Sequence, residues 1–518
     1  MAPFFLKDKS PYFLKIEIFN TKSIGIIKSR IRIFLTTIFL ITIYSLQGQD
    51  YRAIHGSSWA GSLAVANNPS SIVYAPFTWD FTPLAFQFKQ STNAIIINNI
   101  SYLPPWKKAD LKSSNGTFKR FLFANQDMRL LNARIRLNSN SAIAFGLSMR
   151  EYLSVKTSKL NMQDTIDRLR EFMGINTTNI PASAEGRGNM WAEIFGTYAR
   201  TILMPANAII NAGITVKVNY GGAGGYLTAS GLDEVPGLVN NKPGYYLTNG
   251  NLKYGYSSNL DVFDSALTFA GGTKDFLRKI IPTIGISLGA EYIIPADIGG
   301  DASGYGYSLK IGVSLLDLGY NKFHYSNYSR SAILNKNNVS DSLIDFFFAN
   351  IVDAASVADS LQNIAGSTNA FQGNFKLYQP GRLVINIDKH IIDNFFINGE
   401  LTLPLTSVLE KKQLIARDMN LISLTPRYET KAFGIYFPVS LNTQMKYWIG
   451  GAIKTGPFLL GFHNLANIFG KNKIQEGGAY LAFTFRFGGK DENITDRVSG
   501  QKISVRQSKQ LRCPTRVQ

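Results

Sequence analysis

The stretch TIGISLGAEY, residues 283–292, alternates apolar and small or polar residues with a period of two. One set of alternate positions holds Ile284, Ile286, Leu288, Ala290 and Tyr292, and the other holds Thr283, Gly285, Ser287, Gly289 and Glu291. Successive side chains of a β-strand point to opposite faces of its sheet. The stretch therefore predicts a strand with one apolar face and one polar face.

The same alternation recurs along most of the chain. Strong copies cover residues 305–315, 433–441, 445–453 and 479–487, and weaker copies cover 129–138, 141–150, 212–220, 382–388, 393–403 and 419–428. Together these segments predict an all-β protein of about fourteen strands between residues 81 and 487.

The polar face indicates what surrounds the sheet. It consists mainly of Gly, Ser, Thr and Asn, and only 17% of all residues are charged, against about 25% in soluble domains. A soluble sandwich, the alternative, would turn a charge-rich face to water. An aromatic and aliphatic face opposite a weakly charged one is typical of a barrel with lipid outside and a polar lumen inside. Since an open sheet edge would leave backbone groups unpaired in lipid, we predict a closed transmembrane antiparallel β-barrel in an outer membrane.

Residues 1–48 have the features of an export signal. The apolar run Ile33–Leu46 follows several basic residues and precedes Gly48 and Gln49, near which we expect cleavage. The run is shorter than the roughly 18 apolar residues of a membrane helix, although an uncleaved anchor is the alternative. The full chain has a formal net charge of +19, and residues 1–48 hold seven basic and two acidic residues, so about +14 remains after cleavage. Such an exported chain is expected to meet the anionic groups of outer-membrane lipid or lipopolysaccharide rather than nucleic acid.

The end of the alternating region has two notable features. The last strand carries Phe483, Phe485 and Phe487 at alternate positions, which resembles the C-terminal signal read by the barrel assembly machinery. Residues 488–518 have no period and are rich in Lys and Arg, so we expect a basic, flexible periplasmic tail, with a protein partner as one role for it. The single cysteine, Cys513, lies in this tail and excludes a disulfide framework.

Two inserts break the alternation with apolar residues near a helical period. They cover residues 157–173 and 339–365. In membrane barrels the long loops lie outside the cell and the short turns in the periplasm, so both inserts are expected to form helical extracellular caps.

A non-strand segment, residues 49–80, precedes the barrel and contains the run Ala66-Asn67-Asn68-Pro69-Ser70-Ser71. This run resembles the N-terminal hatch motif of the long-chain fatty-acid transporter superfamily, with Ser70 in place of the usual alanine. The run Gly312–Gly319 is similar to a strand-to-turn motif of these barrels, and the chain as a whole resembles uncharacterised outer-membrane barrels of the Bacteroidota. The resemblance implies a periplasmic plug with Asn67, Asn68, Pro69 and Ser70 as its motif, and it implies no particular substrate.

If the apolar faces meet lipid, several basic residues point into the lumen. They are Arg134, Arg136, Arg150, Lys217, Lys310, Lys446, Lys454 and Arg486, opposed by Glu291, Asp388 and Glu400. A cationic lumen would concentrate anions. Alternatively, these charges pair with the acids or the plug and only stabilise the barrel.

These features favour passage of small hydrophobic or anionic solutes through a plugged lumen. The alternative is a structural or interaction barrel, an accessory of a cell-surface secretion or envelope assembly. An enzyme is not expected, because the sequence G-x-S-x-G is absent, and His324 and His390 are only the first candidate general bases. The scattered histidines and the single cysteine suggest no metal site, and no cofactor is expected.

Overall fold

The computed structural model describes most of the chain after the export signal. The described residues are 51–99, 110–166, 168–177, 181–205, 207–263, 269–296, 306–349, 351–405, 413–415, 417–469, 473–488, 493–495 and 502–504. The predicted signal, 1–48, lies outside the described residues, as does Cys513 with most of the tail. Within the tail, β25 (Asn493–Thr495) pairs with β26 (Lys502–Ser504).

The wall is a closed antiparallel barrel of 14 strands, as the alternation predicts. In wall order it consists of β1 (Trp79–Thr92), β4 (Gly116–Asn138), β5 (Ser141–Met162), β6 (Ala182–Leu203), β7 (Ile209–Val239), β9 (Pro282–Pro295), β10 (Tyr307–His324), β15 (Arg382–Ile392), β16 (Phe395–Pro404), β17 (Asn420–Glu429), β18 (Phe433–Tyr436) with β19 (Val439–Asn442), β20 (Tyr447–Ile449) with β21 (Gly451–Thr455), β22 (Phe458–Phe462) and β24 (Glu476–Phe487). Pairing of β1 with β24, from Trp79 opposite Phe487 to Ser91 opposite Glu476, closes the circle. No sheet edge is left along this seam.

The side chains of the wall are arranged as in a membrane barrel and not as in a soluble protein. On β9, Ile284, Ile286 and Leu288 are 38–66% exposed on the outside. On the other face of the same strand, Ser287 and Glu291 are buried on the inside, at 2% and 4% exposure. The polar face is thus the covered one, and an apolar band faces outward.

The two ends of the barrel differ. At one end the strands are joined by short turns, such as Ser139–Asn140 between β4 and β5, and Asp393–Asn394 between β15 and β16. Strand β1 begins at this end and β24 ends there, where the rings of Trp79 and Phe487 stack with centroids 4.0 Å apart. Strand β1 starts at Trp79, two residues before the predicted boundary of the barrel at residue 81.

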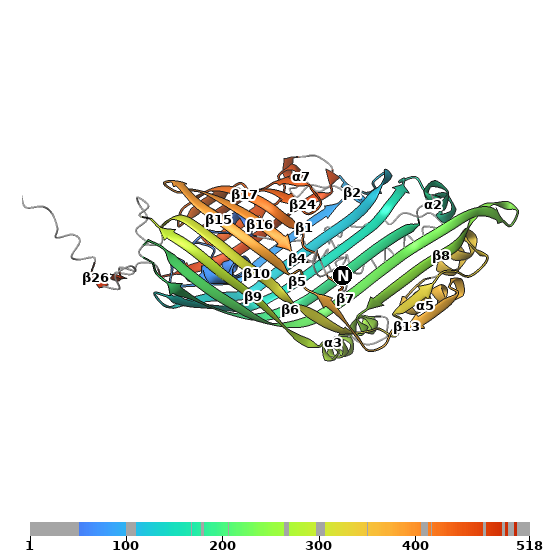
Figure 1. Ribbon diagram of the computed structural model, residues 1–518, viewed down its shortest axis with the longest axis horizontal. Coiled ribbons are helices and arrows are strands. Elements are labelled where there is room, and N and C mark those ends of the chain that lie inside the picture. Colours follow the sequence, from blue (N-terminus) through green and yellow to red (C-terminus); the bar gives the residue numbers. More distant parts are fainter. Residues whose placement is uncertain are drawn as a thin grey trace, which may run out of the picture.

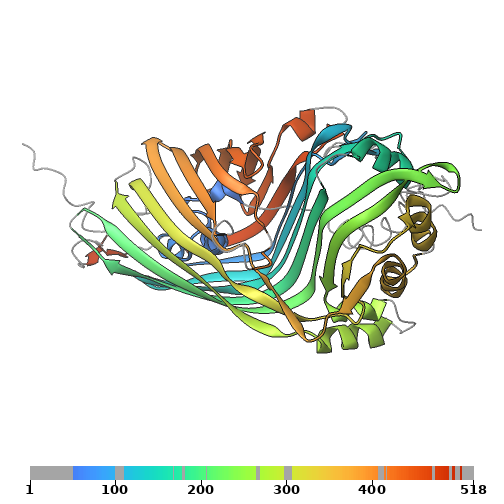
Figure 2. The ribbon, with the colours of Figure 1, turned by 45° about the vertical axis from the view of Figure 1, so that its right-hand side comes forward.

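The opposite end carries the long connections, whose strands extend the wall sheet beyond the barrel and have helices packed against them (Figures 1 and 2). The second half of β7, from Gly225 to Val239, pairs with β8 (Lys242–Tyr256). Strand β8 also pairs with β11 (Arg330–Ile333) and β12 (Val339–Ser340). Against these lie α4 (Asp341–Phe348) and α5 (Ala354–Ile364), both within the second predicted insert. The remaining elements at this end are β2 (Ile95–Asn98), β3 (Asp110–Ser113), α2 (Leu169–Asn176), η4 (Ser258–Phe263), α3 (Phe269–Arg278), β13 (Ser367–Ala370), β14 (Asn374–Tyr378), α7 (Ala466–Phe469) and β23 (Lys473–Ile474).

The first predicted helical insert, 157–173, is largely wrong. Strand β5 continues through Met162, because its last residues pair with β4, from Lys119 opposite Lys159 to Gly116 opposite Met162. A helix, α2, begins only at Leu169. Pairing with a neighbouring strand overrides a helical spacing of apolar residues that covers only a few turns.

Among the described residues, no helix combines the length and the apolar character needed to cross a membrane.

Helix α5 is stabilised at its start by Asp353, whose carboxylate accepts the Ser356 N–H at 2.8 Å. This hydrogen bond, followed by that of the Ser356 side chain, holds the pKa of Asp353 below its usual value. We expect Asp353→Ala to destabilise α5 by about 1 kcal/mol at pH 7. Because the folded pKa is depressed, the contribution is complete above the unfolded value near 3.9 and is lost as pH falls through the folded pKa.

Hydrogen exchange of the α5 amides at pH 7, with Asp359→Ala on the same helix as the control, measures this effect. Asp359 is exposed and lies past the first turn. Equal loss of protection in the two variants would show that the cap contributes nothing. The pH dependence is followed by circular dichroism of the two variants, which should converge in acid.

Candidate functional site

The segment before β1 lies inside the barrel, where Figure 2 shows it in blue between the strands. It contains three short 3-10 helices, η1 (Arg52–Ile54), η2 (Gly61–Ala66) and η3 (Pro69–Ile72). Its apolar side chains pack against the inner wall in three clusters: one with Ala85, Tyr436 and Tyr480, one with Ala142 and Phe195, and one in which Tyr74 meets Ile209, Ile293 and Tyr307. We call residues 51–77 the inner segment.

The predicted motif occupies the middle of the inner segment. Asn68 caps η3 by accepting the Ser70 N–H at 3.0 Å and the Ser70 hydroxyl at 2.7 Å, and it donates to the Ala290 carbonyl of β9 at 2.9 Å. The side-chain amide of Asn67 donates to Glu400 at 2.7 Å, and its backbone carbonyl accepts the Ser314 hydroxyl at 2.6 Å. Pro69 occupies the first turn of η3, where its missing N–H has no helical partner to lose.

Three glycines of the wall make room for this motif. They lie on adjacent strands: Gly213 on β7, Gly289 on β9 and Gly312 on β10. A Cβ at position 213 would lie 2.6 Å from the Pro69 carbonyl carbon and 2.7 Å from the Ser70 nitrogen. Side chains at these positions would therefore collide with the motif, and their absence lets the inner segment approach the wall.

Basic residues of the wall bind the backbone of the inner segment. Arg134 donates to the Ile72 and Phe77 carbonyls at 2.6 and 3.0 Å, and Arg136 donates to the Ala75 and Phe77 carbonyls at 2.7 and 2.9 Å. Arg486 donates to the Trp59 carbonyl at 3.0 Å. Lys310 and Lys454 act through side chains: Lys310 reaches Ser58 at 3.3 Å, and Lys454 binds Glu429, which also accepts the Ser57 hydroxyl.

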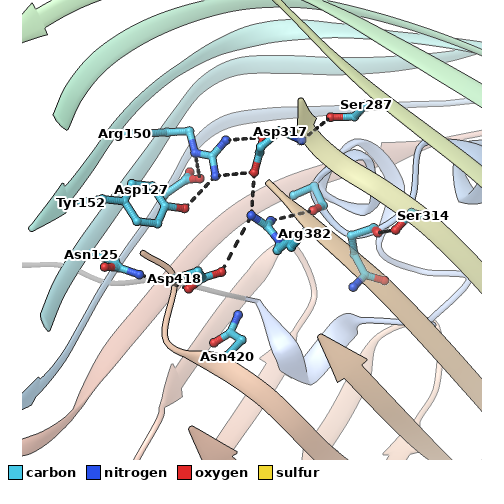
Figure 3. A network of polar contacts seen from close by, with 12 residues as sticks. Asn125, Asp127, Arg150, Tyr152, Ser287, Ser314, Asp317, Arg382, Asp418 and Asn420 are labelled. Atoms are coloured by element: carbon cyan, nitrogen blue, oxygen red, sulfur yellow. Dashed lines mark hydrogen bonds and ion pairs between the residues drawn. The ribbon is translucent and has the colours of Figure 1, made fainter. Parts of the chain in front are cut away.

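A network of buried charges lies directly over the inner segment and is centred on Asp317 of β10 (Figure 3). Its carboxylate accepts hydrogen bonds from Arg150 of β5 at 2.7 and 3.0 Å, from Lys217 of β7 at 2.7 Å and from Arg382 of β15 at 2.6 Å. All four side chains are at most 9% exposed. Arg150 and Lys217 also contact Glu193, at 3.7 and 3.4 Å, and Arg150 contacts Asp127 at 3.4 Å.

A local irregularity of β10 allows Asp317 to hold this position. The pairing of β9 and β10 shifts between Leu315 and Leu318, and Asp317 has a φ of +57°. Its N–H donates to the Ser287 hydroxyl of β9 at 3.0 Å. The bulge inserts an extra residue into the strand, so a residue that strict alternation would place outside points into the lumen.

The network continues across the lumen to the opposite wall. Arg382 lies 3.8 Å from Asp418, whose carboxylate accepts hydrogen bonds from Lys89 of β1 at 3.0 Å and Asn125 of β4 at 3.1 Å. Asp418 belongs to the connection between β16 and β17 and is 5% exposed. Charged side chains thus link β10, β15 and β1 above the inner segment, and we call this set of contacts the transluminal network.

The predicted lumen-facing residues divide clearly. Arg134, Arg136, Arg150, Lys217, Lys310, Lys454 and Arg486 all point inward and contact carboxylates, hydroxyl groups or backbone carbonyls. The prediction that Lys446 points into the lumen is wrong. Strand β19 ends at Asn442 and β20 begins at Tyr447, so Lys446 is exposed in the turn between them.

The acids have partners as well. Glu291 accepts the Ser71 hydroxyl, Asp388 binds Arg427 at 2.6 Å, and Glu400 binds His55 at 2.6 Å. Sequence reasoning missed Lys89, Asp317, Arg382 and Asp418. The one available signal was the run Leu315-Leu316-Asp317, where two consecutive leucines break the alternation.

The other predicted residues lie apart from this site. Phe483, Phe485 and Phe487 are 37–43% exposed on the outer face of β24, and their role in assembly stays a prediction. His324 ends β10 at the long-connection end, whereas His390 lies near the short turn after β15. Within the part of the chain that the structure describes, no three His, Cys, Asp or Glu side chains are grouped to hold a metal ion.

The chain belongs to a family of unknown function (DUF5723), whose model matches residues 82–463. No curated protein matches the chain. Among solved structures it is similar to the toluene transporter TbuX of Ralstonia pickettii, with 11% identity, a TM-score of 0.39, and coverage of 86% of this chain and 100% of that one. A FadL homologue of Pseudomonas aeruginosa has 9% identity, a TM-score of 0.37, and coverage of 86% and 98%. A deletion mutant of the monoaromatic hydrocarbon channel TodX has 10% identity, a TM-score of 0.37, and coverage of 85% and 100%.

Proposed function

We propose that this protein is an outer-membrane barrel through which a small, mainly hydrophobic solute passes when the inner segment moves. The observation that carries the proposal is the inner segment itself. It packs against the inner wall of a closed barrel and leads into β1, so it could move without breaking the wall pairing. Cleavage near Gly48 or Gln49 would leave its other end free to move.

The contacts of the inner segment are of a kind that can exchange. Arg134, Arg136 and Arg486 bind backbone carbonyls, and water can replace those carbonyls once the segment moves. The net contribution of one such hydrogen bond to a charged group is about 1.5–3 kcal/mol. Moving the segment therefore has a cost, and a bound solute would have to offset it by binding the displaced state more tightly.

The charges of the lumen favour a hydrophobic or neutral solute over an anionic one. In the transluminal network each of Arg150, Lys217 and Arg382 contacts a carboxylate other than that of Asp317 as well. An anion would have to compete with Asp317, which lies 2.6–2.7 Å from all three cations. A cationic lumen that concentrates anions is thus the weaker of the two interpretations.

The test is conductance in a planar bilayer, for the refolded protein with and without residues 51–77. We expect the complete protein to stay closed most of the time, and the shortened protein to form stable channels. Heat-modifiable migration in electrophoresis serves as the control that both forms are folded barrels. If neither folded form conducts, passage through the lumen is contradicted.

A second function, an interaction barrel in an envelope assembly, is favoured by the long-connection end. Phe346 of α4 is 70% exposed and the nearby Val352 is 69% exposed, outside the band formed by the wall strands. Large apolar side chains on such an insert are typical of contact with another protein. Co-purification of a stoichiometric partner that Phe346→Ser abolishes would favour this function over passage.

A further inference from the structure

Four buried amide side chains lie inside the barrel next to the transluminal network, and they form two pairs: Asn189 with Asn321, and Asn219 with Gln379. Asn189 lies on β6, Asn219 on β7, Asn321 on β10, and Gln379 between β14 and β15. Each is at most 2% exposed. The function proposed above makes no use of them.

Most of the hydrogen-bonding capacity of these amides is unmet. Asn321 donates to the Asn189 Oδ1 at 2.9 Å. Among the described residues, no partner meets the Asn189 Nδ2, the Asn321 Oδ1 or either side-chain polar atom of Asn219 and Gln379. The large majority of buried side-chain polar groups have a hydrogen-bond partner in folded proteins, and leaving one without a partner is unfavourable. A cluster of this size therefore indicates a place where an external hydrogen-bonding group binds.

Two of the amides converge on one point. A Cβ at Gly285 of β9 would lie 2.9 Å from the Asn219 Nδ2 and 3.5 Å from the Gln379 Oε1. Gly319 of β10 is paired with Gly285, and a Cβ there would lie 3.4 Å from the same Gln379 oxygen. One donor and one acceptor thus lie close to the same pair of glycines, Gly285 and Gly319.

The surroundings of the amides differ on their two sides. Asn219 follows Lys217 of the transluminal network at the next inward position of β7. In the opposite direction Asn321 is followed by Phe323, which stacks with Phe375 and packs against Leu377. The amides therefore lie between a layer of paired charges and an aromatic cluster.

We propose that the four amides form a binding site for a neutral solute with an apolar body and a hydroxyl or amide head group. The head group would donate to and accept from Asn219 and Gln379, while the body would lie toward Phe323 and Phe375. An uncharged head group suits neutral amides, since an ion would be poorly compensated there. The inference rests on the proposed passage of solutes and names the class of solute.

Binding is measured as the shift of the thermal midpoint with four probes of similar size: benzyl alcohol, benzamide, toluene and benzoate. We expect the alcohol and the amide to bind the complete protein about tenfold more tightly than toluene, since two additional hydrogen bonds are worth on the order of 1.4 kcal/mol. In Asn219→Leu/Gln379→Met this preference should disappear, while toluene binds as before. Asn363→Leu, an exposed amide of α5, is the control and should keep the preference.

Equal binding of all neutral probes to the complete protein would overturn the proposal, as would an unchanged preference in the double variant. If none of the four probes shifts the thermal midpoint, the amides hold only water, and this result would overturn the proposal too. The single variants Asn219→Leu and Gln379→Met serve if the double variant does not fold. If the protein without residues 51–77 forms channels but the complete protein does not prefer the alcohol and the amide, this inference is wrong and the proposed function is supported. If the complete protein shows that preference but the shortened protein forms no channels, the binding site is supported and the proposed function is wrong.

Discussion

Replacing Asp317 with asparagine is expected to lower the free energy of unfolding by about 3–5 kcal/mol, because breaking a buried pair leaves uncompensated charge. Arg150, Lys217 and Arg382 all bind this one carboxylate within 2.7 Å. The neutral amide of the variant could still accept a hydrogen bond, but it would not offset the repulsion between the three cations. Water would enter to solvate them, and we expect the channels that this variant forms when the inner segment is removed to prefer anions.

The measurement is denaturant-induced unfolding in detergent micelles, with Asp359→Asn on the exposed face of α5 as the matched control. Addition of Lys217→Met removes one of the three cations and should recover part of the lost stability in Asp317→Asn. A double variant less stable than Asp317→Asn would show that the charges are not coupled as the distances imply. A loss below about 1 kcal/mol in the single variant would place the pair among weak surface ion pairs.

Replacing Gly213 with alanine is expected to drive the inner segment away from the wall. The new Cβ would lie 2.6–2.7 Å from backbone atoms of Pro69 and Ser70, and no side-chain rotation relieves a contact with backbone. Overpacking of this kind costs about 1–3 kcal/mol. If the cost falls on the closed state alone, the ratio of closed to open channels should drop by roughly tenfold or more.

Single-channel recording with Gly196→Ala as the control measures this change. Gly196 lies on β6, and a Cβ there would meet no atom within 4 Å, so the control carries the same substitution without the collision. Faster proteolysis within residues 51–77 should accompany the opening of Gly213→Ala. Unchanged conductance together with unchanged proteolysis would contradict the view that contact with this glycine holds the segment in place.

The sequence by itself determined the wall of this protein. An alternation such as Ile284–Tyr292 is a local property, because a strand places neighbouring residues on opposite faces whatever its partners are. Together with the low charge, it was enough to predict a closed barrel of about fourteen strands and the inward direction of Arg134, Arg150 and Lys217. The prediction failed where strands end, as at Lys446, since a turn cannot be distinguished from a strand by period alone.

Only the tertiary structure decided how the inside is filled. The pairing of Asp317 with Arg150, 167 positions earlier, depends on a bulge in β10 and on the curvature of the wall, and neither leaves a periodic trace in the sequence. The same holds for Asp418 and Lys89, which are 329 positions apart. Contacts across a lumen join residues without regard to their separation along the chain. A sequence pattern can therefore say which side chains point inward, but the folded barrel decides which of them meet.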